Sequence, residues 1–547
     1  MRARPFRHPR LPLLAGVAAL TSIGGPGAAA APERKLTIFY TAEIHGTPEP
    51  CGCTSDPLGD VARYAALARG AARSEAVLLL DGGGLSFPES STPKEKKANE
   101  ARAEFLATAL GSIGPPFAAG LAETDIIGHA TVAPPARLAA NLGHGAGVAP
   151  SWLKSVGGVR VGIVGVADPA LAQDLHATGE DPVAAAKREA ADLRSKGAEL
   201  VIALAPVDKL VARRIARDAA VDLVVLGRQV GKGMARAEKV GNAYLVASAD
   251  ELQRVGRIDI VWRGQGPLVD GGGPEATALR RVEIEQSVAR IDKELEAWAA
   301  APSGGDNAFI EGKRREREAL RAERGKLDAP WTAPAGSYFT NRLIPLRRSL
   351  PRDEKVAAQM RKLDATIAAI NLKSAPPPAP KEPGRPYYVG DAKCAPCHKS
   401  AAAFWKKTVH ASAWKTLVEG GKQNDYKCVS CHVTGYGEVG GSSLGHTDRL
   451  RNVQCEVCHG PGSQHVAEEG LEEPLAVHTQ TPASTCTACH TEQHSDTFQY
   501  EAYLRDIIGP GHGPTARKKL GDGPTGHELR TAALARAKTA GKAQIQN

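Results

Sequence analysis

Short apolar runs alternate with Ala- and Arg-rich stretches of helical length through the first half of the chain. The runs cover residues 36–40, 76–80, 159–166, 200–204, 221–226 and 244–247. Short apolar runs of this kind, separated by helical stretches, are typical of buried strands in a layered sheet. The pattern predicts an α/β layered domain, which we place at residues 31–270.

A different periodicity follows in the middle of the chain. Apolar residues recur at spacings of four and three, which predicts an amphipathic helix: Ile284, Val288, Ile291, Leu295 and Trp298. A charged helix over 312–326 would complete a helical hairpin. Because the repeat covers only two heptads, a spacer or docking element is favoured over a dimeric coiled coil. With a further helix at 353–372, we expect a helical hairpin and connector over 271–372.

Prolines mark the last boundary. Six of them between Pro376 and Pro386 predict a stiff, extended linker at 373–386. Residues 387–513 form the next expected domain, which is mainly helical. The remaining segment, 514–547, is basic and rich in Ala, Gly and Lys, and we expect a frayed tail.

The first thirty residues have the order of a secretory signal peptide. Four arginines precede an apolar run over 11–23, and small residues lead to an expected cleavage after Ala30. The run is shorter than the roughly 20 residues of a membrane span, and no later stretch is long and apolar enough to cross a bilayer. We therefore expect a periplasmic or secreted protein without an integral membrane span.

The net charge does not indicate nucleic acid. The formal charge of the 547 residues is +9, and it falls to about +5 once the four arginines of the leader are removed. This excess is small and scattered along the chain.

Eight of the ten cysteines fall into four copies of the pattern Cys-x-x-Cys-His. Two thiols at this spacing can add to the two vinyl groups of one haem, and the adjacent imidazole becomes an axial ligand of its iron. Zinc sites and disulfides are the alternatives, but neither requires a histidine after every second cysteine. The pattern predicts four covalently attached haem c groups, held by Cys394 and Cys397, Cys428 and Cys431, Cys455 and Cys458, and Cys486 and Cys489, with His398, His432, His459 and His490 as proximal ligands.

Other histidines decide whether each iron is open, because an iron with histidine on both faces has no free position. Eleven of the 16 histidines follow Pro386. Apart from the four proximal ligands, the candidates are His410, His446, His465, His478, His494, His512 and His527.

Residues flanking the motifs carry a family resemblance. They read FWKKTVHA at 404–411, CVSCHVTGYG at 428–437 and CEVCHGPG at 455–462, and an aromatic-rich helix at 498–508 precedes His512. In order and spacing, the stretch from Tyr388 to about His512 resembles the tetrahaem cytochrome c554 family, which accepts electrons from hydroxylamine oxidoreductase in ammonia oxidisers. The resemblance implies a multihaem cytochrome c domain that transfers electrons between redox partner proteins.

The resemblance also implies distal ligands. Carried over by position, His465 would face the haem of His398, His410 that of His490, and His512 that of His459. The haem of His432 has no distal ligand in the family, which implies one five-coordinate iron. His446 departs from the family pattern nearby and is an alternative ligand for that iron, whereas His478, His494 and His527 are expected at the surface.

The N-terminal half resembles exported 5′-nucleotidases and related metallophosphoesterases. The resemblance rests on LTIFYTAEIHG at 36–46, LLDGGG at 79–84, GIVGV at 162–166 and LVVLG at 223–227. It implies a strand ending in metal ligands at the first two segments and further strands at the others.

Most of the ligands that the resemblance implies are missing. His45 is present and Glu43 can stand in for the expected Asp, but Gly84 replaces the bridging Asp and Pro206 replaces a His. Arg228 and Val230 replace a further pair of His, and the segment 128–131 at best shifts one histidine, His129, by a position. Two divalent ions need about seven ligands to activate water, so we expect an inactive phosphoesterase fold, with residual hydrolysis as the alternative.

Cys51 and Cys53 are the only thiols outside the four motifs. A bridge within Cys-x-Cys closes a small, strained ring, so a disulfide is not the default. A soft metal site with His45, a redox pair and a structural loop all remain open.

Two classes of function remain. The first is a periplasmic electron carrier whose phosphatase-like domain docks a partner. The second is a haem enzyme that converts a small nitrogen or sulfur compound at the iron of His432. The sequence does not specify the donor, the acceptor or the oligomeric state.

Overall fold

The computed structural model describes residues 33–127, 130–131, 137–143, 147–264, 266–299, 307–470 and 476–546. The expected signal peptide and His129 lie outside these residues. Among the described helices, none combines the length and apolarity that crossing a membrane requires.

Two sheets stack face to face in the N-terminal half. The first has the strand order β14-β15-β13-β1-β2-β3-β6, with bounds Val269–Asp270, Tyr338–Pro345, Arg254–Trp262, Arg34–Thr41, Val77–Asp81, Phe117–Gly120 and Arg137–Leu138. The second has the order β11-β12-β10-β9-β8-β7, with bounds Glu238–Val240, Ala243–Val246, Leu223–Leu226, Leu200–Ala205, Val159–Gly165 and Ser151–Val156. Two short strands, β4 (Ile126–Ile127) and β5 (Ala130–Thr131), pair separately.

The main core lies between the two sheets, where the inward side chains of both interdigitate. Ile38 and Leu80 of the first sheet share this core with Ile163 and Ile202 of the second, and all four are buried. Burial of this apolar area is the chief stabilising contribution to such a sandwich. All six predicted apolar runs are strands here, which confirms the α/β layered fold.

Helices cover both outer faces. On the first sheet lie α1 (Val61–Ala71), α2 (Lys96–Gly111) and α8 (Glu354–Ser374). On the second lie α4 (Pro182–Ser195) and α5 (Lys209–Asp218), with the short α3 (Leu171–Asp174) near its edge. Parallel strands β1 and β2 end at the same edge, so the segments after them meet there.

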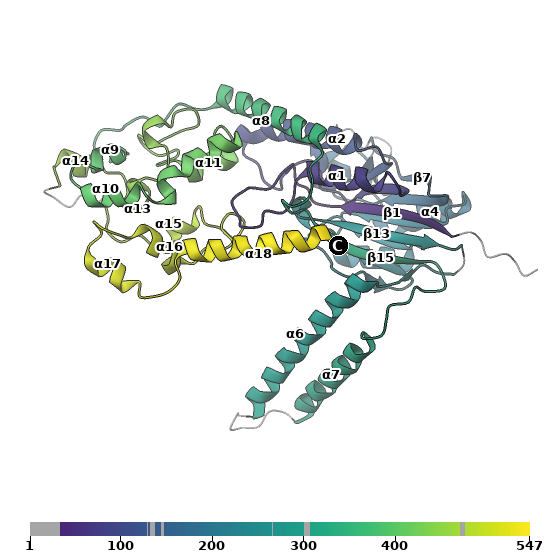
Figure 1. Cartoon of the computed structure of the whole chain (residues 1–547). Coiled ribbons are helices and arrows are strands. Elements are labelled where there is room, and N and C mark those ends of the chain that lie inside the picture. The colour runs from purple at the N-terminus through teal and green to yellow at the C-terminus, as the bar shows by residue number, and fades with distance from the viewer. Residues whose placement is uncertain are drawn as a thin grey trace, which may run out of the picture.

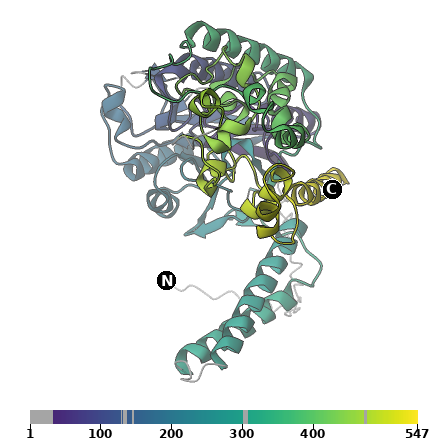
Figure 2. The ribbon, with the colours of Figure 1, turned by 90° about the vertical axis from the view of Figure 1, so that its left-hand side faces the viewer.

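The connector contains the predicted hairpin and one element that was not predicted. Helices α6 (Pro274–Ala299) and α7 (Asn307–Lys326) pack against each other and project away from the sheets (Figures 1 and 2). Strand β15, however, pairs with β13 along eight residues, so the α/β layers extend beyond residue 270. Asn341 and Arg342 interrupt its apolar pattern. Asn341 is nevertheless buried, because its carbonyl oxygen accepts a hydrogen bond from the hydroxyl of Tyr40 at 2.9 Å.

The C-terminal region consists of short helices. They are α9 (Asp391–Cys394), α10 (Lys399–Trp405), α11 (Ala413–Gly420), α12 (Tyr426–Val429), α13 (Cys455–His459), α14 (Ser463–Ala467), α15 (Ala483–Thr487), α16 (Tyr500–Ile507) and α17 (Pro514–Lys519). Its apolar core is a small cluster around Tyr426, Val429, Val433 and Leu444. The region therefore relies little on buried apolar side chains of its own.

The prediction of a frayed tail at 514–547 is wrong. Residues Gly526–Gln546 form α18, which runs back to the sheets (Figure 1). The amide of Gln544 donates to the carbonyl oxygen of Pro345 at 2.7 Å, and Ala533 is buried. Ala, Leu, Arg and Lys favour helix, so local propensity and docking both stabilise α18.

Candidate haem site

The four Cys-x-x-Cys-His motifs lie on or beside short helices. Cys394 ends α9, Cys428 lies in α12, Cys455 begins α13, and Cys486 lies in α15. All eight motif cysteines are free thiols with at least partial exposure. Each motif therefore presents two thiols and an imidazole from one compact turn.

Three proximal histidines face three distal candidates. The ring centres of His398 and His465 are 6.1 Å apart, those of His410 and His490 are 6.2 Å apart, and those of His459 and His512 are 6.4 Å apart. Two metal–nitrogen bonds of about 2 Å, plus about 1 Å from each nitrogen to its ring centre, add to about 6 Å. Each pair therefore leaves room for one iron between its two rings.

Hydrogen bonds orient the proximal imidazoles. Nδ1 of His432 lies 2.6 Å from the carbonyl oxygen of Ala413, and Nδ1 of His459 lies 2.8 Å from that of His478. Nδ1 of His490 lies 3.0 Å from the hydroxyl of Ser495. A carbonyl accepts only from a protonated Nδ1, which leaves Nε2 of His432 and His459 free to bind metal. No sequence signal pointed to these partners, because two of them are backbone atoms.

Burial keeps the pair of His410 and His490 neutral. Desolvation, with a smaller effect from His490, lowers the pKa of His410 to about 4. Burial also lowers the pKa of His490. Iron binds the neutral imidazole, so both side chains are in the form that ligation requires.

His432 differs from the other three proximal histidines. In the described part of the chain, no imidazole faces it across a gap of this kind. His446 lies in a tight turn whose backbone pairs with Ser443, and its ring is exposed. His478 and His494 likewise form no histidine ring pair among the described residues, and the backbone N–H of His527 donates to Asp506 at 2.7 Å.

Cysteines of different motifs lie next to one another, and these contacts give the motifs an order in space. The thiol of Cys394 lies close enough to that of Cys455 for the two to interact, as does the thiol of Cys431 to that of Cys489. Cys458 and Cys486 interact electrostatically. The first motif therefore adjoins the third, the third adjoins the fourth, and the fourth adjoins the second.

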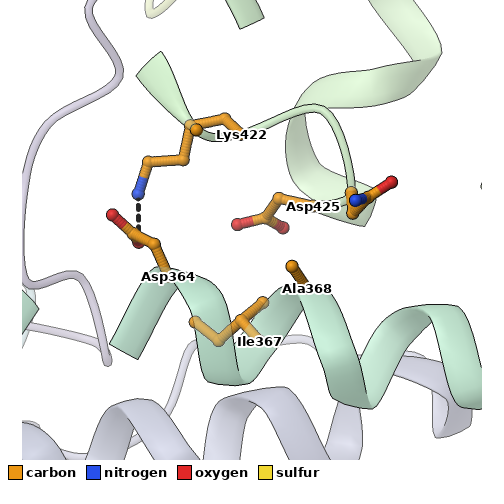
Figure 3. Close-up of a pocket in the computed structure, with 7 residues that line it drawn as sticks. Asp364, Ile367, Ala368, Lys422 and Asp425 are labelled. Carbon is orange, nitrogen blue, oxygen red and sulfur yellow. Dashed lines mark hydrogen bonds and ion pairs between the residues drawn. The ribbon is translucent and has the colours of Figure 1, made fainter. Parts of the chain in front are cut away.

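The segment before the second motif is held by the N-terminal half. The guanidinium of Arg102 in α2 forms a buried ion pair with Asp425 at 2.7 Å. Lys422 reaches Asp364 of α8 at 2.5 Å, and Figure 3 shows this pair beside Asp425. Burial alone would lower the pKa of Lys422, but the carboxylates of Glu49 and Asp364 outweigh it and raise the pKa. These contacts fix the second motif against α2 and α8.

The position where the resemblance implies a two-metal site is taken up by contacts within the protein. Both carboxylate oxygens of Glu43 accept backbone N–H groups, from Gln229 at 2.7 Å and Val230 at 2.8 Å. A Cβ added at Gly83 would lie 2.8 Å from the ring of Pro206. Glu43, His45 and Glu89 form the one candidate metal-ligating group found within the described ranges. Three ligands, one of them already engaged, do not form a two-metal site.

A buried ion pair lies next to this position. Asp125 and Arg137 are 2.9 Å apart and almost fully buried. Asp125 also accepts the backbone N–H groups of Gly84, Leu85 and Ser86. The loop in which the resemblance expects a bridging Asp is therefore held by Asp125 from another segment.

Comparison with known protein families gives a match in the C-terminal region. Residues 393–460 match the family model described as cytochrome c554 and c-prime. Cytochrome c-554 of Nitrosomonas europaea is 37% identical over 91 residues, which cover 14% of this chain and 39% of that protein. The chain thus spans about two fifths of this curated relative.

Three solved structures align over 61–71% of this chain. The 5′-nucleotidase precursor of Thermus thermophilus is 17% identical, covers 71% of this chain and 68% of its own, and has a TM-score of 0.42. The sulfate thiohydrolase SoxB of the same species is 14% identical, with coverages of 63% and 62% and a TM-score of 0.41. The calcineurin-like phosphoesterase YfkN of Bacillus subtilis is 15% identical, with coverages of 61% and 98% and a TM-score of 0.40.

The match to the cytochrome c554 model supports a c-type cytochrome with covalently bound haem c in the C-terminal region. The N-terminal region joins to it the α/β layers described above.

Proposed function

We propose that the chain is an exported electron-transfer protein that carries four covalent haem c groups. The observation that carries the proposal is the set of three histidine pairs with ring centres 6.1–6.4 Å apart. Each pair joins one Cys-x-x-Cys-His motif to a histidine from another segment. Such cross-links would hold a region that has little apolar core of its own.

The residues fit the group that they would hold. Cys394, Cys397, Cys428, Cys431, Cys455, Cys458, Cys486 and Cys489 would attach the haems, and His398, His432, His459 and His490 would be proximal ligands. The distal ligands would be His465, His512 and His410. Haem c supplies a one-electron iron couple whose potential depends on its axial ligands and its surroundings.

The spatial order of the four motifs supports a relay of electrons from haem to haem. The neighbouring cysteines give the motifs the spatial order first, third, fourth and second. The ends of this spatial order are the first motif, near α14, and the second motif, against α2 and α8. We propose that one end serves a redox partner protein and that the phosphatase-like domain docks a partner at the other end.

A second candidate function rests on His432. This histidine is unlike the other three in lacking a facing imidazole among the described residues. An open iron at this position would bind a small nitrogen or sulfur compound, and the protein would then be a haem enzyme. The contacts of Glu43 and the packing of Pro206 on Gly83 favour both candidates over residual hydrolysis.

Haem content tests the proposal. The full chain, produced with a cytochrome c maturation system, should show four haem additions by intact mass under denaturing conditions. The double variant Cys486→Ser/Cys489→Ser should lose one of them. A wild-type protein with fewer than four haems would contradict the proposal.

A further inference from the structure

The loop between β1 and α1 leaves the α/β layers and reaches the haem region. Glu49 at one end of its tip forms an ion pair with Lys422 at 2.6 Å. At the other end, the backbone N–H of Ser55 donates to the carboxylate of Asp496 at 3.0 Å, and the hydroxyl of Ser55 binds the same carboxylate. Lys422 precedes the second motif and Asp496 follows the fourth. The tip therefore spans from one motif to the other.

Further contacts hold this tip. Arg347, just after β15, pairs with Asp56. Arg530 of α18 donates to the carbonyl oxygen of Thr54 at 3.3 Å. The haem region, the segment after β15 and helix α18 thus all contact residues 49–56. These contacts hold the tip beside the haem region.

The tip carries the two cysteines outside the motifs. The thiols of Cys51 and Cys53 are close enough to those of Cys428 and Cys431 to interact electrostatically. They also interact with each other, and this interaction lowers the pKa of Cys51 to about 7 and raises that of Cys53. Cys51 is exposed, so an external thiol can reach it.

A metal site is a weaker explanation for this pair. Within the described ranges, the group that could ligate a metal consists of Glu43, His45 and Glu89 and includes neither thiol. A structural role does not require two thiols either, because the ion pair and the hydrogen bonds at Glu49, Ser55 and Asp56 already hold the loop. What distinguishes Cys51 and Cys53 is their place beside the second motif, which is one end of the spatial series of motifs.

We propose that Cys51 and Cys53 form a dithiol/disulfide site through which electrons from an external thiol enter the spatial series of haems at the second motif. The inference rests on the proposed function, since it needs haem at Cys428 and Cys431. In the oxidising step, two S–H bonds break, one S–S bond forms and two protons pass to water. The two electrons leave the sulfurs one at a time, each reducing one ferric haem of the holoprotein.

The external thiol completes the cycle by exchange. Its thiolate attacks the Cys51–Cys53 bond, and a second thiol resolves the mixed disulfide, which restores both protein thiols and releases a small disulfide. A disulfide in so small a ring is strained and is therefore the more readily reduced. The substrate class is accordingly a low-molecular-weight thiol or a partner dithiol.

Alkylation and electron counting test the site in the full holoprotein. After oxidation with ferricyanide and removal of excess oxidant, Cys51 and Cys53 should resist alkylation by iodoacetamide under denaturing conditions and should react after reduction with dithiothreitol. Coulometric reduction should then take about six electrons per chain in wild type and about four in Cys51→Ser/Cys53→Ser. The haem absorbance of the same samples counts the haem electrons separately.

Each outcome has a distinct meaning. Four haem electrons with no additional uptake in wild type, or free thiols in the ferric protein, would overturn the dithiol site and leave the proposed function intact. A haem count below four would contradict the proposed function itself. A stoichiometric metal ion that is lost in Cys51→Ser would also overturn the site. Ser195→Ala, at an exposed hydroxyl at the end of α4 on the second sheet, is the matched control and should behave as wild type.

Discussion

The three histidine pairs differ from His432 in a way that ligand binding can detect. An iron with imidazoles on both faces does not bind carbon monoxide until one of them is removed, whereas an open iron binds it directly. His465 faces His398 across 6.1 Å, and its Nδ1 is buried without a hydrogen-bond partner among the described residues. An iron held by both rings would fix the ring of His465 in this position.

Replacement of His465 should open a second iron. In ferrous His465→Ala, carbon monoxide binding should rise from about one to about two per four haems, because the haem of His398 loses its sixth ligand. Spectrophotometric titration measures the number of carbon monoxide molecules bound per four haems. His446→Ala is the matched control and should leave the stoichiometry at about one. If His446→Ala instead raised it, His446 would be the ligand of the fourth iron.

A buried carboxyl at the end of β2 makes stability depend on pH. Burial raises the pKa of Asp81 to about 7, although the hydroxyl of Thr41 donates to it at 2.6 Å. A carboxyl with a raised folded-state pKa contributes stability that is complete below its unfolded pKa and is lost as the pH rises through the folded value. Asp81 therefore destabilises the sheet at pH 8 relative to pH 4.

Asp81→Asn should remove this dependence. The gain of the variant over wild type should grow by about 2–4 kcal/mol between pH 4 and pH 8. Hydrogen exchange of β1 and β2 in the intact protein, corrected for the intrinsic effect of pH, measures the gain locally. Asp218→Asn, at an exposed carboxyl, should show no such growth. An equal gain at both pH values would contradict the assignment to Asp81.

At the scale of elements, six strands of the sandwich and the hairpin could be predicted, because each follows a local apolar period. Strand β15 and helix α18, which were not predicted, depend on distant partners. Strand β15 contains the polar Asn341, whose side-chain oxygen accepts a hydrogen bond from Tyr40, some 300 residues earlier. Helix α18 is polar along most of its length and is fixed by contacts at Pro345 and Thr54.

Removal of α18 should loosen the haem region from the sheets. A chain that ends at Thr525 loses the contacts of Arg530 and Gln544, and cleavage in the linker 376–386 should become about 5- to 30-fold faster, as expected for a loss of 1–2 kcal/mol. Limited proteolysis measures the rate. Arg536→Ala, at an exposed site of the same helix, should cleave like wild type. Unchanged cleavage of the truncated chain would show that α18 does not hold the two parts together.

For the whole molecule, the candidate site was predictable where its chemistry lies in a local motif. The attachment residues follow from Cys-x-x-Cys-His alone, and the distal histidines required a family resemblance, because their partners lie up to 80 residues away. The loop of Cys51 could not be placed from sequence. Its position depends on Lys422 and Asp496, which reach it only in the folded chain.

The α/β domain should not hydrolyse phosphate esters. Glu43 is engaged by two backbone N–H groups and Pro206 packs on Gly83, so a pair of divalent ions has no ligand set. The full chain should release no phosphate from AMP above background with manganese, cobalt or magnesium. Release that stops with a chelator and in His45→Ala would contradict this.

Carbon monoxide titration of the ferrous wild-type protein is the most direct test of the central claim, which is four haems with three closed irons and one open iron. The account predicts saturation at about one carbon monoxide per four haems. Saturation at zero would show that all four irons carry two protein ligands, and saturation at two or more would show that at least one of the histidine pairs does not ligate iron. Either result would contradict the account.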